Sequence, residues 1–158
     1  MASNLKNLGS HSDKNMGSLK NKKIGIVVSE WNDQITDSLL SAALEVLSNH
    51  GAKPKNIIIK YVPGSFELPL AAQYLASQKD IEAVICLGCV IQGETRHFDF
   101  ICDAVANGIT NVGLKFNKPI IFGVLTTNTL QQALDRAGGK HGNKGEEAAF
   151  TAVKMLSF

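Results

Sequence analysis

The chain has 158 residues, of which 44% are hydrophobic and 19% charged, so it can bury one core but is too short for two ordinary domains. Its net charge of +2 is uneven: residues 1–23 hold five of the 16 basic and one of the 14 acidic residues, which leaves 11 basic and 13 acidic residues elsewhere. A nearly neutral body excludes the broad basic surface of a nucleic-acid-binding protein.

Targeting signals are missing from the sequence. No apolar stretch reaches membrane-spanning length, and the N-terminus lacks the apolar core of a signal peptide. We therefore expect a cytoplasmic protein with no membrane partner. The three cysteines lie in apolar surroundings, which is typical of reduced, buried thiols. Residues 1–21 are polar and rich in Gly, Ser and Asn, and we predict a flexible N-terminal arm there, followed by one domain over residues 22–158.

From residue 22 onwards, short apolar runs alternate with helical patterns. Asn32 and Asp33 are expected to cap the first helix, and Pro69 is expected in the first turn of the second. Predicted strands cover 24–28, 56–62, 82–91 and 119–127, and predicted helices cover 33–50, 67–78, 96–116, 129–137 and 145–157. This alternation predicts an α/β fold: a flavodoxin-like, three-layer α/β/α sandwich with a four-stranded parallel sheet.

The predicted strands end in segments that carry chemically useful side chains. Ligands of open parallel sheets bind outside the carboxyl ends of the strands. The segments at those ends are 29–32, 62–67, 90–97 and 126–129. Together they supply an exposed aromatic ring, an amide, a hydroxyl, carboxylates and an imidazole, which predicts a site at this edge.

The segment "VIQGETRH", residues 90–97, is the strongest of these. Gly93 is expected to let the backbone turn, and Thr95 to act as the N-cap of the next helix. The unbonded N–H groups of residues 93–96 would then form an anion site. A helix N-terminus disfavours an imidazolium, so His97 should stay neutral and able to accept a proton. A capped helix with an ordinary surface histidine remains an open alternative.

A second candidate is "RAGGKHGNKG", residues 136–145, in which four basic or imidazole side chains surround glycines. It is not a Walker loop, and a solvated turn remains an alternative. If the helix after the fourth strand runs back along the sheet, residues 138–145 lie far from the strand ends of their own subunit. Arg136 and Lys144 would then share a ligand with His97 only across a subunit boundary, which predicts a homo-oligomer with shared sites.

Other catalytic patterns are weak. The cysteines of "CLGC" lie on a strand, where residues three apart face opposite sides of the sheet, so a catalytic dithiol is not expected. The cysteines and histidines show no metal-site spacing, and "PGSFE" lacks the second glycine of a nucleophile elbow. We expect no metal and no cofactor.

Five motifs in this order, "WND", "VPGSFELP", "VIQGETRHFDF", "FGVLTT" and "RAGGKHGNKGEEA", resemble the 6,7-dimethyl-8-ribityllumazine synthase family from about residue 22 to the C-terminus. The resemblance implies a transferase of riboflavin biosynthesis that needs no cofactor. It would condense 5-amino-6-(D-ribitylamino)uracil with 3,4-dihydroxy-2-butanone 4-phosphate to 6,7-dimethyl-8-ribityllumazine, releasing phosphate and water.

The resemblance also implies a role for each matching residue. His97 matches the general base. Residues expected to bind the phosphate are Glu94, Thr95 and Arg136. Residues expected to bind the pyrimidine and its ribityl chain are Trp31, Asn32, Ser65, Phe66, Glu67, Cys89, Val90, Ile91, Phe122 and Lys144. Of these fourteen, the resemblance places Phe122, Arg136 and Lys144 on the adjacent subunit.

Two positions depart from the commoner family pattern, because Glu30 and Gln92 stand where a basic residue is frequent. Both remove positive charge near the anion site. Family members form pentamers, and the short turn at residues 138–145 favours an icosahedral 60-mer, with riboflavin synthase as a further partner. Two rival functions stay open: a non-catalytic flavin- or lumazine-binding shell protein, and an archaeal-type riboflavin synthase.

Overall fold

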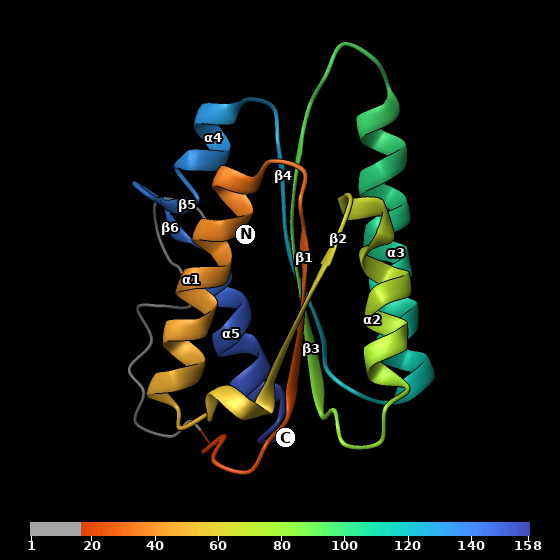
Figure 1. Cartoon of the computed structure of the whole chain (residues 1–158). Helices are drawn as coiled ribbons and strands as arrows, with labels where there is room; N and C mark the ends of the chain where they lie inside the picture. The colour runs from red at the N-terminus through yellow and green to blue at the C-terminus, as the bar shows by residue number, and fades with distance from the viewer. Residues whose placement is uncertain (1–16) are drawn as a thin grey trace.

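The computed structural model describes residues 17–158 and has three layers (Figure 1). Its centre is a parallel sheet with the strand order β2-β1-β3-β4. The strands are β1 (Ile24–Ser29), β2 (Ile57–Val62), β3 (Ala83–Ile91) and β4 (Ile120–Thr127). Each begins and ends within two residues of its predicted bounds, and the predicted α/β fold is confirmed.

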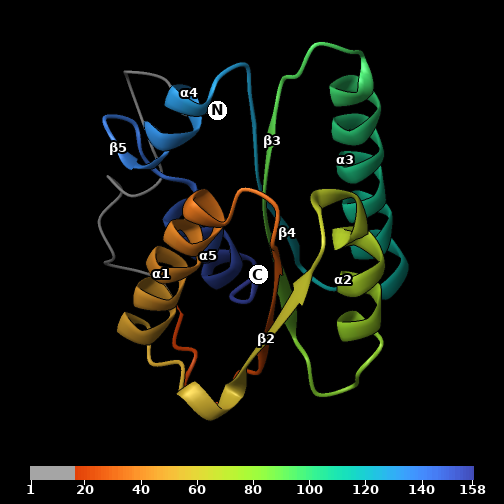
Figure 2. The same cartoon turned by 45° about the horizontal axis from the view of Figure 1, so that its top comes forward.

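Helices cover both faces of the sheet, as Figures 1 and 2 show. On one face lie α1 (Asp33–Asn49) and α5 (Lys144–Met155), and on the other lie α2 (Leu68–Ala76) and α3 (His97–Phe116). Shorter elements join them: η2 (Pro54–Asn56), η3 (Ser65–Glu67), α4 (Leu130–Leu134), and a hairpin of β5 (Ala137–Gly139) and β6 (Gly142–Asn143).

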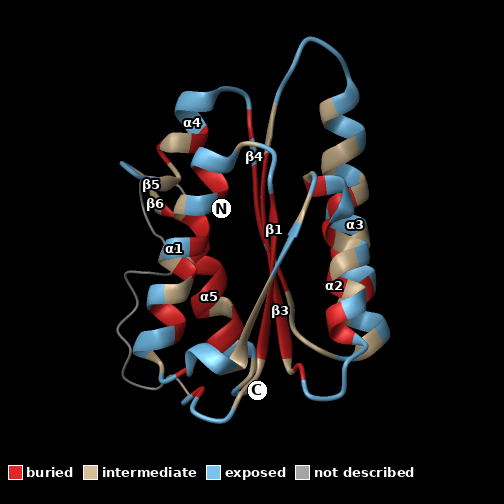
Figure 3. Cartoon of the chain, viewed as in Figure 1, coloured by how far each residue is buried: buried red, intermediate tan, exposed pale blue. Residues whose placement is uncertain are grey.

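The core consists of two apolar clusters, one on each side of the sheet (Figure 3). Successive strand residues point to opposite faces, so Ile26 packs with α1 and α5 while Val27 packs with α2 and α3. All six residues of β1 are buried. A strand covered on both faces is apolar at nearly every position, which explains the apolar runs in the sequence.

Two glycines allow helices to approach closely. A Cβ added to Gly108 of α3 would stand 2.7 Å from Cγ of Pro69, which lies in the first turn of α2 as predicted. A Cβ added to Gly145 of α5 would stand 1.9 Å from the carbonyl oxygen of Leu39 in α1. These positions set the spacing within each helical layer, because no larger residue fits without a backbone shift.

The segment after β4 differs from the prediction. Helix α4 has only five residues rather than the expected span of 129–137, and the expected glycine-rich turn contains the β5–β6 hairpin. Asp135 holds it together: its carboxylate accepts from Gln131 and pairs with Lys140, both at 3.0 Å, and its carbonyl accepts from the His141 N–H at 2.8 Å. The bonds to Lys140 and His141 close the turn between α4 and the hairpin.

Residues 1–16 of the predicted N-terminal arm lie outside the described residues. Leu19, also within the predicted arm, is 1% exposed and joins the cluster beneath α1. Its N–H donates to the His50 carbonyl at 2.8 Å. The packed part of the chain therefore begins no later than Leu19. Within residues 17–158, no helix combines the length and hydrophobicity needed to cross a bilayer.

Candidate active site

The carboxyl end of β3 reaches beyond that of β1. The β1–β3 ladder ends where Val28 pairs with Leu87, whereas β3 continues against β4 until Ile91 pairs with Thr127. Within the described chain, residues 88–91 of β3 therefore pair with a strand on one side only, which is β4. The exposed flank at this strand end provides the floor of a pocket.

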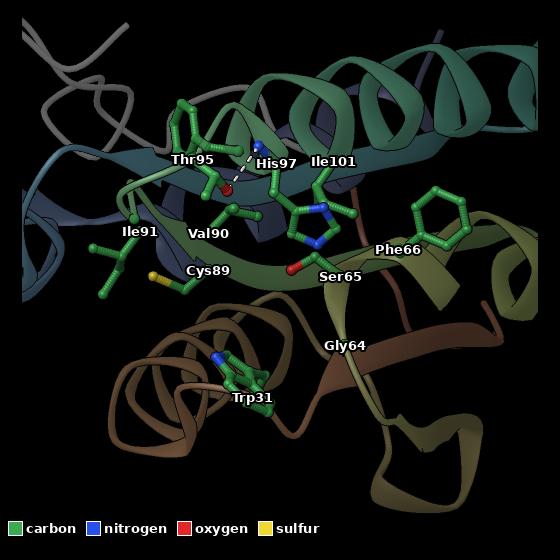
Figure 4. Close-up of a pocket in the computed structure, with 12 residues that line it drawn as sticks. Trp31, Gly64, Ser65, Phe66, Cys89, Val90, Ile91, Thr95, His97 and Ile101 are labelled. Atoms are coloured by element: carbon green, nitrogen blue, oxygen red, sulfur yellow. Dashed lines mark hydrogen bonds between the residues drawn. The ribbon is translucent and has the colours of Figure 1, made fainter.

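We call this pocket the histidine pocket. It encloses about 400 Å³ and is built from four segments: the β1–α1 connection, η3, the end of β3 and the start of α3. Figure 4 shows His97 and Trp31 reaching toward the end of β3 from different elements. The lining residues are Trp31, Gly64, Ser65, Phe66, Cys89, Val90, Ile91, Gly93, Thr95, His97, Phe98 and Ile101.

Two aromatic rings at this pocket are unusually open to solvent. Trp31 is 72% exposed and Phe66 is 56% exposed. Burying such rings is favourable, and their presence beside a hollow is typical of a surface that a ligand or partner covers. Trp31 is the only tryptophan of the chain.

The start of α3 carries the imidazole and an array of backbone donors. Thr95 was predicted to be the N-cap, but that was wrong: the cap position is Arg96, and α3 begins at His97 itself. The Thr95 hydroxyl still accepts a hydrogen bond from the His97 N–H, at 3.4 Å (Figure 4). Within residues 17–158, the N–H groups of residues 93–96 donate no hydrogen bond, so four donors remain available beside the imidazole.

The Gln92 side chain stabilises the loop before α3 with two hydrogen bonds. Its side-chain amide donates to the carbonyl oxygens of Gly93, at 2.8 Å, and Thr95, at 3.3 Å. These contacts hold two carbonyl groups on the Gln92 side of the loop. Gln92 therefore orders the loop without adding charge.

The expected reason for glycine at position 93 was also wrong. Gly93 is not among the three described glycines with positive φ, and an added Cβ would meet no atom within 4 Å. The turn itself does not require glycine. What the missing side chain leaves is open space at the wall of the histidine pocket.

Ser65 places an unsatisfied hydroxyl in the same pocket. The residue is 6% exposed, and its Oγ has no hydrogen-bond partner within the described chain. Gly88 makes room for it, because a Cβ at that position would stand 2.6 Å from the Ser65 Oγ. A buried hydroxyl without a partner is destabilising, and it indicates a position where a ligand can complete the hydrogen bond.

The cysteines behave as neutral side chains. Burial raises the pKa of the Cys89 thiol to about 11 and that of Cys86 to about 12. Cys86 belongs to the cluster under α2 and α3, and Cys89 to the cluster under α1 and α5. The two thiols thus face opposite sides of the sheet as predicted, and Cys89 contributes an uncharged wall to the histidine pocket.

A second hollow, the arginine pocket, lies along β4. It measures about 430 Å³ and is lined by Phe122, Val124, Leu125, Thr126, Thr127, Gln132, Arg136 and Lys144. It shares no lining residue with the histidine pocket. The expectation that the 138–145 segment lies far from its own strand ends was wrong: α4 is too short to run back along the sheet, so the chain stays near Thr126 and Thr127.

The cations of the arginine pocket differ in their partners. The Arg136 Nη1 donates to the Gln132 carbonyl at 3.1 Å, and no carboxylate of residues 17–158 pairs with its guanidinium. Lys144 instead forms an ion pair with Glu147, three residues further along α5. Arg136 therefore carries the charge that remains free for an anion.

The structure gathers most of the fourteen predicted site residues. Eight line the histidine pocket: Trp31, Ser65, Phe66, Cys89, Val90, Ile91, Thr95 and His97. Phe122, Arg136 and Lys144 line the arginine pocket. Asn32, Glu67 and Glu94 line neither; the Glu67 carboxylate accepts from the Gly64 N–H at 3.0 Å and so stabilises η3.

Some lining residues had been missed. Phe98 and Ile101 lie within the predicted helix over 96–116, and nothing in the sequence marked them as site residues; both are half-buried and line the histidine pocket. Helical periodicity cannot separate a core contact from a pocket wall on the same stripe. Gln132 gave no signal, because it reaches the arginine pocket only through the short turn of α4.

A parallel α/β sandwich with a pocket outside the carboxyl ends of its strands belongs to a class of proteins that bind small-molecule ligands at this edge. Residues 21–158 match the 6,7-dimethyl-8-ribityllumazine synthase family. The chain belongs to this family of enzymes.

Similarity to individual relatives extends over nearly the whole chain. The 6,7-dimethyl-8-ribityllumazine synthase of Cytophaga hutchinsonii is 63% identical over 99% of this chain and 98% of its own. The enzyme of the same name from Parabacteroides distasonis is 51% identical over 100% of this chain and 99% of its own. That from Porphyromonas gingivalis is 50% identical over 98% and 96%.

Proposed function

We propose that the chain condenses 5-amino-6-(D-ribitylamino)uracil with 3,4-dihydroxy-2-butanone 4-phosphate to give 6,7-dimethyl-8-ribityllumazine, phosphate and water. The observation that carries this proposal is the start of α3, where His97 lies beside four unbonded N–H groups in a chain of this family. A leaving phosphate and a proton acceptor are the two things that this reaction needs in one place.

The pyrimidine substrate fits the neutral part of the histidine pocket. Trp31 offers an exposed ring for stacking, and Cys89 an uncharged wall. The ribityl chain is a polyol, and the unsatisfied Ser65 hydroxyl matches it because a polyol hydroxyl both donates and accepts. Phe66 and the η3 backbone border the same end.

The phosphorylated substrate fits the loop before α3. Backbone N–H groups at a helix start bind phosphate without a dedicated cation. The uracil amine attacks the ketone, and loss of water gives an imine. Removal of a neighbouring proton, for which His97 is the proposed base, expels phosphate and leaves an enol. The enol becomes a ketone, and attack by the second nitrogen closes the ring with loss of another water.

The complete site requires a second copy of the chain. The histidine pocket holds the proposed base and amides, whereas the unpaired cation Arg136 lies in a different pocket together with Phe122 and Lys144. We propose a homo-oligomer in which the arginine pocket of one copy adjoins the histidine pocket of the next, with Arg136 stabilising the departing phosphate. A pentamer, its assembly into an icosahedral 60-mer, a partnership with riboflavin synthase and a cytoplasmic location all stay predictions.

The test is to mix the purified chain with both substrates and follow fluorescent lumazine and inorganic phosphate together. Equal molar formation of both is expected. If the chain leaves these two substrates unchanged but converts supplied 6,7-dimethyl-8-ribityllumazine into riboflavin and 5-amino-6-(D-ribitylamino)uracil without releasing phosphate, it is a riboflavin synthase. Binding without turnover would indicate a shell protein. Sedimentation, and a structure of the assembly, test the shared site: Arg136 remote from every His97 would contradict it.

A further inference from the structure

Asn32 has an unusual backbone for a residue with a side chain. Its φ is 63° and its ψ is 46°, which is the left-handed helical region. Among residues 17–158, the only other residue besides glycine with positive φ is Asn117, at the end of α3. Residues with a Cβ avoid this region, and asparagine tolerates it best.

The Asn32 side chain does not cap α1, contrary to the sequence prediction. Its amide nitrogen instead donates to the carbonyl oxygen of Cys89 at 2.9 Å. The carbonyl can only accept, so the chemistry fixes which end of the amide points at it. This bond joins the β1–α1 connection to β3, 57 residues away in the sequence.

The position of that carbonyl explains why a side chain is used. The β1–β3 ladder ends at Val28 and Leu87, two residues before Cys89. Beyond this point β1 turns away, and its backbone no longer lies beside β3. The Asn32 side-chain amide takes the place of a β1 backbone N–H and donates to the next free carbonyl of β3, that of Cys89.

Trp31 lies between two such attachments. Its own N–H donates to the Pro63 carbonyl at 3.1 Å, and the preceding Glu30 N–H donates to Val62 at 2.8 Å. Asn32, directly after it, is attached to β3. Because Trp31 is 72% exposed, few contacts hold its ring, and the backbone on either side has to set the direction of the ring.

We propose that Asn32 is a positioning residue: its left-handed backbone and its bond to the Cys89 carbonyl hold the Trp31 ring at the wall of the histidine pocket. Asn32 acts through Trp31 rather than by touching the ligand, which agrees with its absence from the pocket lining. The part that concerns substrate binding rests on the function proposed above. The part that concerns the Trp31 ring does not.

Three variants test the proposal. Asn32→Gly keeps the left-handed backbone without strain but removes the bond. Asn32→Asp keeps the shape but sets a carboxylate oxygen against the Cys89 carbonyl. Asn117→Gly is the matched control, since it makes the same change at the other left-handed asparagine, outside both pockets. Sedimentation of each variant checks that the assembly is retained.

The first readout is the fluorescence anisotropy decay of Trp31 in ligand-free protein, which reports one residue because the chain has a single tryptophan. Both Asn32 variants should show a larger nanosecond component than the parent, and Asn117→Gly should not. The second readout is steady-state kinetics. Loss of one hydrogen bond predicts a KM for the pyrimidine raised about tenfold, with kcat changed less than about threefold.

Each mixed outcome has a definite meaning. A raised KM with unchanged anisotropy would overturn the positioning role and assign Asn32 to direct ligand contact. A more mobile Trp31 ring with an unchanged KM would show that holding the ring does not help substrate binding. No change in the anisotropy decay or in the KM would overturn the whole proposal. If the parent protein makes no lumazine, the proposed function fails, while the anisotropy comparison still decides whether Asn32 holds Trp31.

Discussion

Ser65→Ala should make the free protein more stable and its substrate binding weaker. Ser65 is buried, and its hydroxyl has no partner in residues 17–158. Alanine removes the hydroxyl and keeps the Cβ, so packing against Gly88 is relaxed rather than lost. The protein therefore gives up only a group that is poorly solvated and unbonded.

The expected changes in stability and in KM both follow from the Ser65 hydroxyl, which lacks a hydrogen bond in the free protein and would gain one in the complex. An unsatisfied buried hydroxyl costs roughly 1–3 kcal/mol, so we expect the free energy of unfolding to rise by about 1 kcal/mol once lost contacts are included. For a chain of this length that corresponds to a Tm higher by about 2–4 °C. In the complex a polyol hydroxyl would bond to Ser65, and losing that bond should raise the KM for the pyrimidine about 2- to 10-fold.

The assay compares thermal unfolding at one fixed protein concentration, because assembly makes Tm depend on concentration. Ser38→Ala is the matched control. The Ser38 hydroxyl donates to the Ala137 carbonyl at 2.6 Å, so the same change there should lower Tm and leave a carbonyl without its donor. The two serine variants should therefore shift Tm in opposite directions.

A Ser65→Ala protein that loses as much stability as Ser38→Ala would refute the reasoning. It would mean that the Ser65 hydroxyl is bonded in the assembled protein. An unchanged KM together with a raised Tm would place the ribityl chain elsewhere.

The other predictions concern the base, the cation, a helix contact and a thiol. His97→Ala should lower kcat about 10- to 100-fold without abolishing turnover, because substrate positioning survives. Arg136→Ala should raise the KM for the phosphorylated ketone far more than that for the pyrimidine. Gly145→Ala should lower the free energy of unfolding by about 1–3 kcal/mol in denaturant titrations, because its Cβ would stand 1.9 Å from the Leu39 carbonyl. Alkylation of Cys89 should be slow at pH 8, where a pKa of about 11 leaves roughly one thiolate per thousand, and should accelerate as pH rises toward 11.

Each of these has a control or a contrary result. Complete loss of turnover with intact substrate binding in His97→Ala would contradict the division between proton transfer and positioning. Equal weakening of both substrates in Arg136→Ala would count against a phosphate role. Gly93→Ala is the stability control for Gly145→Ala, since its Cβ meets no atom within 4 Å. Rapid alkylation of Cys89 in folded protein at pH 8 would show that its burial is less complete than described.

Strand and helix positions were predictable because their signal is local. A strand buried on both faces is apolar along nearly its whole length, and β1 as far as Val28 and β3 show this directly. The β5–β6 hairpin was not predictable in the same way. It has three and two residues, no alternating pattern, and a hydrogen bond from the Ser38 hydroxyl to the Ala137 carbonyl, 99 residues further along the chain.

In the candidate site, too, some features follow from local sequence and others depend on long-range packing. The sequence by itself determined which groups are available to a site: His97 at a helix start, a run of backbone donors before it, an aromatic ring after β1, and cations near residue 140. Side-chain type and the order of elements are written in the chain, and parallel connections bring the strand ends to one edge. Only the tertiary structure decided which of these residues lie in the histidine pocket and which lie in the arginine pocket.

It placed Arg136 beside β4, in a pocket separate from that of His97, because α4 ends after five residues. It also left the Ser65 hydroxyl without a partner among residues 17–158 and directed the Asn32 amide to the Cys89 carbonyl. Such facts depend on where β1 stops relative to β3 and on which atoms then lie within hydrogen-bonding distance. Distances between residues far apart in sequence are set by packing, and no local pattern encodes them.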